Sequence, residues 1–250
     1  MTRRRATRFL IGLAALLLVA AAALVVFRLP LAETLIRRGL AAQGLSHVTL
    51  TVRELGLDGA RLTDIALGDG REIEIPDLRL AYSLGGLAAG RVERVDISKS
   101  RLRLDLTGRA PPLGSLQGFL QGLGGTGRAA GPLPHARLRD ARIEAVTPAG
   151  PVTLDLTGEV APQAGGRIQA AFDLSLAAAF GARAAGRLTA AGDPGAEIAG
   201  ALALSDGAVD LAATEIRGAQ GEIAFRLQGL RPRALDGRLA IGRLALQGAE

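Results

Sequence analysis

Apolar and polar residues alternate along most of the chain from residue 46 onward. Strict alternation over short segments is typical of strands in an antiparallel sheet with one apolar and one polar face. Turn signals separate these segments at Asp58-Gly59, Gly68-Asp69-Gly70, Asp206-Gly207 and Asp236-Gly237. The pattern predicts roughly a dozen strands. The alternating apolar positions are Val48, Leu50 and Val52; Ile73, Ile75, Leu78, Leu80, Tyr82 and Leu84; Leu102, Leu104 and Leu106; Val152, Leu154 and Leu156; Ile168, Ala170, Phe172, Leu174 and Leu176; Leu202 and Leu204; Ile223, Phe225 and Leu227; Leu239 and Ile241; and Leu244 and Leu246.

Two segments carry the helical period instead. Residues 29–45 predict a short amphipathic helix, which fits either a helix lying near the membrane surface or one that caps the end of a sheet. Residues 111–125 start with prolines and end in glycines, as a helix of about three turns would. A Gly/Pro linker follows to residue 134. The helical apolar positions are Leu31, Leu35, Ile36 and Leu40 in the first segment, and Leu113, Leu116, Phe119, Leu120 and Leu123 in the second.

An uninterrupted apolar run extends from Phe9 to Phe27. As a helix it spans about 28 Å, close to the hydrocarbon thickness of a bilayer. Four arginines precede the run, which favours a cytoplasmic N-terminus. The alternative is a cleavable signal peptide with small residues at Ala20–Ala23, but Leu24-Val25-Val26-Phe27 continues the run without a break. We therefore expect residues 1–28 to be a cytoplasmic tip and an uncleaved membrane anchor.

The strand region is weakly repetitive. Leu104–Gly108 recurs as Leu154–Gly158, and Ala60–Asp64 resembles Ala136–Asp140. This self-similarity indicates a sheet lengthened by stacking similar hairpins. We expect two segments of that sheet, at residues 46–110 and 135–250, separated by the helix and linker of residues 111–134.

The amino-acid composition indicates how such a sheet shields its apolar face from water. The chain has no Trp, one Tyr and only 3% aromatic residues. An outer-membrane barrel needs aromatic girdles, and a dry sandwich normally recruits aromatics to fill its centre. A trough lined by Leu, Val, Ile and Ala is a smooth surface that suits acyl chains. The pattern favours the trough and leaves the sandwich open.

Charge and candidate chemistry narrow the function classes. Five of the 30 basic residues and none of the 24 acidic ones lie within residues 1–28, so the remainder is close to neutral and lacks a nucleic-acid footprint. The chain has no Cys. Residues 122–127 match G-x-G-x-x-G, but they follow a predicted helix instead of a strand. His47 and His135, the only histidines, fit exposed turns better than a metal site. We predict no catalytic residue, no cofactor, no metal and no enzymatic activity.

Several stretches resemble the AsmA-like, YdbH-type proteins of Gram-negative bacteria. They are LPLAETLIRRGLAAQGL after the anchor, VTLTVRELGLDGARLTDIALG, LRLAYSLGGLAAGRVERVDISKSRLRL at residues 78–104, and ARLRDARIEAVTPAGPVTLDLTGEV at residues 136–160. The resemblance implies a curled groove of β-sheet that is anchored in the inner membrane and moves phospholipids toward the outer membrane.

The expected fold is thus mainly β: an N-terminal transmembrane helix, then an elongated, curled antiparallel β-groove with one or two short amphipathic helices. We expect a single-pass inner-membrane protein whose bulk is periplasmic and whose partners are phospholipids, the inner membrane and an outer-membrane or periplasmic protein. The groove-facing, lipid-binding candidates are Val48, Leu50, Val52, Leu102, Leu104, Leu106, Val152, Leu154, Leu156, Phe172, Leu174, Leu176, Leu202, Leu204, Ile223, Phe225 and Leu227.

Two further expectations concern alternatives and length. The alternative function is a non-enzymatic structural or assembly factor of the cell envelope, with a β-sandwich whose open edge recruits partner proteins. YdbH-type proteins are usually much longer, and this chain stops at Ala249-Glu250 directly after a predicted strand. We therefore expect a truncated chain, or one whose groove is continued by partners.

Overall fold

The computed structural model describes residues 29–41, 45, 47–89, 91–108, 111–114, 133–193, 196–211, 214–228 and 231–246. The predicted anchor, the G-x-G-x-x-G match and residues 115–125 of the second predicted helix lie outside these residues. Within the described part, no helix combines the length and the apolar content that crossing a bilayer requires.

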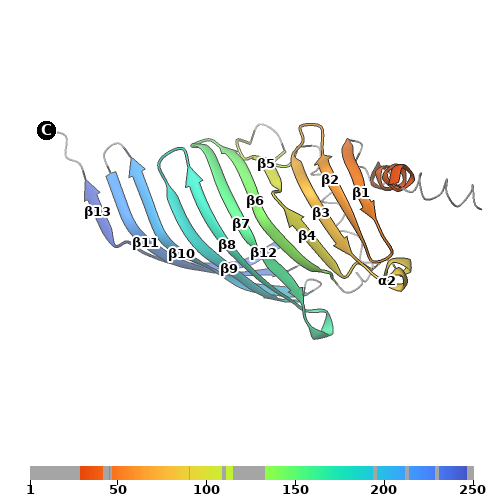
Figure 1. Ribbon diagram of the computed structural model, residues 1–250. Helices are drawn as coiled ribbons and strands as arrows, with labels where there is room; N and C mark the ends of the chain where they lie inside the picture. The colour runs from red at the N-terminus through yellow and green to blue at the C-terminus, as the bar shows by residue number, and fades with distance from the viewer. Residues whose placement is uncertain are drawn as a thin grey trace, which may run out of the picture.

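The described strands all belong to one sheet. They are β1 (Val48–Leu55), β2 (Gly59–Leu67), β3 (Ile73–Ala81), β4 (Arg94–Ser98), β5 (Arg101–Asp105), β6 (His135–Thr147), β7 (Gly150–Pro162), β8 (Ile168–Ala178), β9 (Arg183–Gly192), β10 (Glu197–Leu211), β11 (Thr214–Gln228), β12 (Arg231–Ala240) and β13 (Arg243–Leu246). Their order is β1-β2-β3-β4-β6-β7-β8-β9-β10-β11-β12, with β13 paired to β11, and β5 paired to β3 and β6. The sheet is long and curled (Figure 1). The described strands therefore form no two-sheet sandwich, and the mainly β, curled-sheet prediction is confirmed.

The prediction of a purely antiparallel sheet is wrong at one place. β4 and β5 both pair with β6 in parallel, whereas every other recorded pairing is antiparallel. Parallel neighbours cannot be joined by a tight hairpin and need a crossover of a dozen residues or more. The long connection across residues 106–134 supplies that length, so the strands on either side of the predicted linker are neighbours in the same sheet.

Three other local predictions are corrected. Leu84 does not continue β3 but starts helix α2 (Leu84–Ala88), because the Ser83 side chain accepts a hydrogen bond from the Gly86 amide and caps the helix. Asp206-Gly207 lies inside β10, and Asp236-Gly237 lies inside β12, so neither pair is a turn. A short 3-10 turn at Ala164–Gly166 joins β7 to β8.

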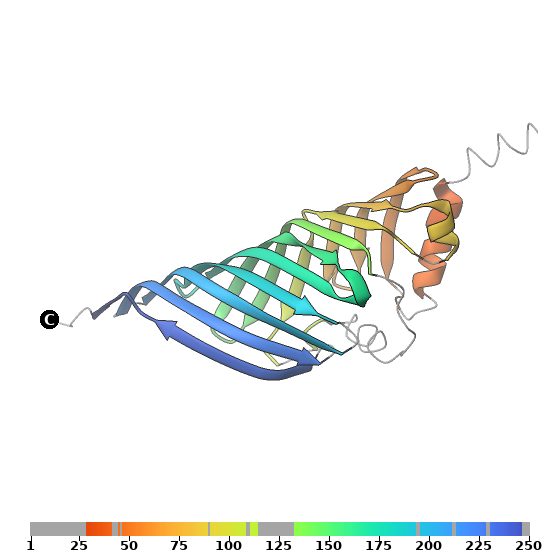
Figure 2. The ribbon, with the colours of Figure 1, turned by 90° about the horizontal axis from the view of Figure 1, so that it is seen from below.

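Bulges curve the sheet at residues with a left-handed backbone. Asp64, Lys99, Asp140 and Asp206 have φ angles of 55°, 57°, 52° and 52°. Register shifts occur beside Asp64, Asp140 and Asp206, and Lys99 interrupts the strand between β4 and β5. Such irregularities bend a strand and increase its twist. The sheet is visibly curled and twisted when seen from below (Figure 2).

A cluster of fully buried residues lies at the N-terminal end of the sheet. Leu50, Val52, Leu62 and Ile65 are buried there. The helix of residues 29–41 packs against this cluster through its apolar side, which consists of Leu29, Ala32, Ile36 and Leu40. The predicted first helix is thus present, and it caps the end of the sheet beside β1 (Figures 1 and 2).

Candidate lipid-binding face

One face of the sheet is apolar from β1 to β11. Directly paired residues on neighbouring strands point to the same face, so the register identifies which side chains lie together. One row of consecutive partners crosses ten strands: Val52, Leu62, Leu78, Ile97, Leu138, Gly158, Phe172, Leu188, Leu202 and Ile223. Every member is apolar or glycine.

The register brings the predicted lipid-binding residues other than Leu50 and Leu106 onto this same face. A second row runs through Val48, Leu67, Ile73, Leu102, Ile143, Leu154, Leu176 and Ala184. Shorter rows add Leu104 beside Ala145 and Val152, Leu156 beside Leu174, Gly186 and Leu204, Gly200 beside Phe225, and Ile198 beside Leu227. Leu106 follows β5, and its amide donates a hydrogen bond to the Val146 carbonyl at 2.8 Å.

The candidates divide into a covered and an uncovered group. Leu50 and Val52 are only 3% and 5% exposed beneath the helix of residues 29–41, so they belong to a closed core. The candidates on β7, β8, β10 and β11 are half-buried, while the polar residues between them are mostly exposed. No described helix or second sheet covers these strands (Figures 1 and 2). A sheet that curls toward one face lowers the solvent exposure of the side chains on that face, and the apolar face is the less exposed of the two.

Sequence reasoning missed several members of the face, including Leu62, Ile97, Leu138, Ile143 and Leu188. The bulges explain most of these omissions, because the apolar series changes phase at each left-handed residue and breaks the period of two. The weak repeat of Ala60–Asp64 in Ala136–Asp140 marks two of the bulged strands. Leu188 was not predicted because the other residues of β9 on this face are only Ala and Gly.

Phenylalanine side chains lie across the sheet at two places instead of standing up from it. Gly158 is paired with Phe172 and Gly200 with Phe225. A Cβ built on Gly158 would meet the Phe172 ring at 2.6 Å, and a Cβ built on Gly200 would meet the Phe225 ring. Each ring thus occupies the place that a side chain would take. The two aromatics add apolar surface without projecting as a barrier along the face.

An apolar depression lies at the C-terminal end of this face. It has a volume of about 220 Å³ and is open to solvent. Leu176 and Leu204, two of the predicted candidates, line it together with Val209, Ile216 and Ile241. Arg183 is the one charged residue of its lining. A wall of branched aliphatic side chains offers dispersion contacts and few specific polar contacts.

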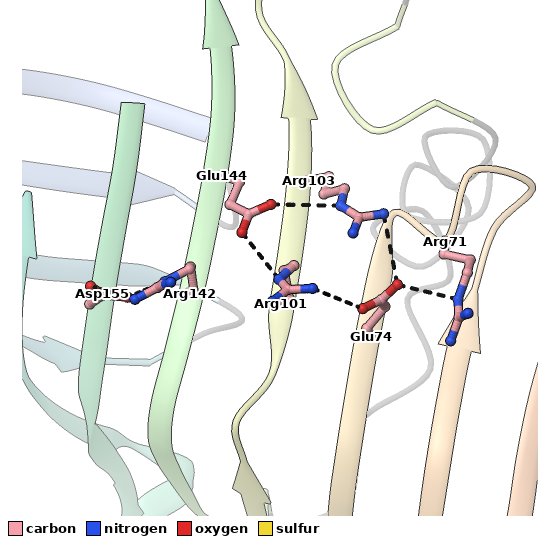
Figure 3. Close-up of polar contacts among 7 residues, drawn as sticks. All are labelled: Arg71, Glu74, Arg101, Arg103, Arg142, Glu144 and Asp155. Atoms are coloured by element: carbon pink, nitrogen blue, oxygen red, sulfur yellow. Dashed lines mark hydrogen bonds and ion pairs between the residues drawn. The ribbon is translucent and has the colours of Figure 1, made fainter. Parts of the chain in front are cut away.

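The opposite face of the sheet is charged. Glu74 on β3 lies within 3.2 Å of Arg71, 3.3 Å of Arg101 and 3.7 Å of Arg103. Glu144 on β6 lies 3.1 Å from Arg101 and 3.7 Å from Arg103, so two carboxylates and three guanidiniums bridge β3, β5 and β6 (Figure 3).

Further arginine–carboxylate pairs continue across the charged face. Arg142 binds Asp155 through two nitrogens at 2.7 and 3.3 Å (Figure 3). The hydrogen bond from Arg187 lowers the pKa of Asp173, and that from Arg61 lowers the pKa of Asp77, so both carboxylates stay ionised. Removing charged groups from water is costly, so this face favours contact with solvent.

The histidines lie apart from each other. His47 Nε2 is 3.2 Å from Asp69 Oδ1 before β1, and His135 Nε2 is 3.4 Å from Glu159 Oε2 at the start of β6. The described residues contain no group of three or more His, Cys, Asp or Glu side chains that could hold a metal ion.

A family model matches the N-terminal part of the chain. It is described as YdbH-like, intermembrane phospholipid transport protein YdbH, and it matches residues 15–111. This stretch contains the helix of residues 29–41 and strands β1–β5. The resemblance stated from the sequence is confirmed there. No curated protein matches the chain. No solved structure matches it either.

Proposed function

We propose that this chain, whose residues 15–111 match the YdbH-like family of intermembrane phospholipid transport, binds phospholipids in the cell envelope along the apolar face of its curled sheet. It is anchored in the inner membrane by residues 1–28, and the sheet lies in the periplasm. The observation that carries the proposal is a continuous apolar face that no described element covers from β7 to β11.

The uncovered part of the apolar face leaves apolar side chains in contact with water, which is unfavourable. Removing apolar surface from water is favourable by about 25 cal/mol of free energy for each Å². A long, half-exposed stripe of apolar side chains therefore favours binding of an apolar ligand. Acyl chains fit because they need no hydrogen-bond partners and can slide along a series of Leu, Ile, Val and Ala side chains. Headgroups would remain at the wet rim. The acyl-binding candidates are those on β5, β7, β8, β10 and β11, since Leu50 and Val52 lie beneath the helix.

The test is native mass spectrometry of the full chain, extracted gently from bacterial envelopes, with matched aspartate substitutions. Leu154→Asp and Leu202→Asp each place a carboxylate on the apolar face. Both positions are half-buried on an uncovered face, so the new carboxylate stays hydrated while the sheet is empty. An acyl chain lying over it would strip that water, which is costly.

The control is Ala203→Asp, which places the same carboxylate on the charged face beside Arg187 of the neighbouring strand. We expect phospholipid to co-purify with the natural sequence and with Ala203→Asp, and to be lost from Leu154→Asp and Leu202→Asp. Circular dichroism checks that each variant keeps its strands. Folded Leu154→Asp and Leu202→Asp variants that retain as much phospholipid as the control would contradict the proposal.

A further inference from the structure

Exposed leucines gather at the N-terminal end of the molecule, on three separate elements. Leu31 and Leu35 lie on the helix of residues 29–41, Leu57 lies in the turn between β1 and β2, and Leu84 and Leu87 lie on α2. The helix and α2 are at the same end of the sheet as β1 (Figures 1 and 2). Leu57 is 74% exposed and Leu35 is 68% exposed.

The helix of residues 29–41 carries apolar residues on two sides, and only one of these sides packs against the sheet. Leu29, Ala32, Ile36 and Leu40 pack on the core. At 100° per residue, Leu31 falls opposite the packed residues, and Leu35, one turn later, lies on the adjoining flank of the helix. Arg38 shares that outer side and is exposed. An outer side with two leucines and an arginine is the composition of a helix that lies in a membrane interface.

The turn and α2 are fixed to each other. The Tyr82 hydroxyl donates hydrogen bonds to the carbonyls of Gly56 and Gly59 at 3.1 and 3.0 Å, and the Tyr82 amide donates to Asp58 at 2.9 Å. These bonds join the segment before α2 to the turn that carries Leu57. Leu84 and Leu87 are three residues apart in α2 and therefore share one side of that helix.

We infer that this end of the molecule, formed by Leu31, Leu35, Arg38, Leu57, Leu84 and Leu87, is a membrane-contact surface that rests on the lipid bilayer. The apolar run of residues 9–27 directly precedes the helix in sequence, so a bilayer that holds this run lies next to the same end. The leucines enter the boundary between headgroups and acyl chains, and Arg38 reaches lipid phosphate. The inference rests on the membrane attachment in the proposed function, and it adds that the start of the apolar face is held at the bilayer surface.

The chain has no cysteine, so a single introduced cysteine gives a unique labelling site. The test reconstitutes the full chain in vesicles of phosphatidylethanolamine and phosphatidylglycerol, with the fluorophore NBD attached at Leu35→Cys, Leu57→Cys or Leu87→Cys. The matched control is Ala224→Cys on β11, because Ala224 is exposed and lies on the charged face at the far end of the sheet, beside Asp236 of β12.

We expect NBD emission at positions 35, 57 and 87 to be blue-shifted relative to position 224, and to be quenched by doxyl-labelled lipid. Emission at these positions equal to that at position 224 would overturn the inference. A blue shift without quenching by doxyl lipid would also overturn it, because a protein surface, and not lipid, would then cover the leucines. Phospholipid that still co-purifies with the chain in either case would leave the proposed function standing.

Discussion

At the scale of single residues, the left-handed bulges keep one face apolar along a curved sheet. Asp64, Asp140 and Asp206 adopt φ angles near 50° that most side chains avoid. Asp is among the few residues that tolerate this conformation. Each bulge lets the apolar series change phase without moving to the other face, as from Leu138 to Ala141 in β6. Of these three aspartates only Asp206 is followed by glycine, so the sequence predicts a turn where the structure has a bulge inside β10.

Substitution of Asp140 tests this role of the bulge residues. Asp140→Gly keeps the left-handed backbone and should leave the free energy of unfolding close to that of the natural chain. Asp140→Val places a β-branched side chain at φ 52°, which should lower the free energy of unfolding by about 1–2 kcal/mol. Urea unfolding of the detergent-solubilised chain measures both. Thr189→Val, in an ordinary part of β9, is the control and should change stability by less than about 0.5 kcal/mol. Equal stability of Asp140→Gly and Asp140→Val would show that the left-handed backbone carries no cost there.

At the scale of elements, the parallel contact of β4 and β5 with β6 joins two short strands to the longer strands of the sheet. Both strands before the crossover are only five residues long. The ion pairs of Glu74 and Glu144 with Arg101 and Arg103 connect the three strands on the charged face (Figure 3). Alternation at Leu102 and Leu104 predicted β5, but neither the parallel pairing nor the partner strand follows from it. The pairing depends on how the chain folds back after the long crossover, and the local sequence pattern does not specify this.

Removal of one carboxylate tests whether the ion pairs stabilise this junction. Glu74 is 21% exposed and has three guanidiniums within 3.7 Å, so Glu74→Gln removes the carboxylate beside Arg71 and one of the two carboxylates beside Arg101 and Arg103. We expect the free energy of unfolding to fall by about 1–2 kcal/mol at low salt and by less at high salt. Glu222→Gln on the exposed side of β11 is the control, and it should change stability by less than about 0.5 kcal/mol. A Glu74→Gln loss as small as that of the control would show that the ion pairs contribute nothing measurable.

At the scale of the whole molecule, the chain is one curled layer with a capped end and an uncovered apolar face. The sequence indicated the layer, because alternation at Leu154, Phe172, Leu202 and Phe225 required one apolar face. It left a sandwich open, because alternation alone does not say whether a second sheet covers that face. The register decides this point by linking Val52 on β1 to Ile223 on β11 through one continuous row. The closed core under the helix of residues 29–41 could not be predicted from the sequence either, because the amphipathic pattern of that helix fits packing against a membrane as well as against a sheet.

The proposed function requires that phospholipid lies on one face of the sheet and not on the other. Photo-crosslinking in cells tests it most directly, with a benzophenone amino acid at positions 202, 203 and 204 of the full chain and phosphate-labelled phospholipids. Leu202 and Leu204 point to the apolar face, and Ala203 between them points to the charged face beside Glu222. We expect labelled lipid to be crosslinked at positions 202 and 204, with little at position 203. Equal labelling at all three positions, or labelling at position 203 alone, would contradict it.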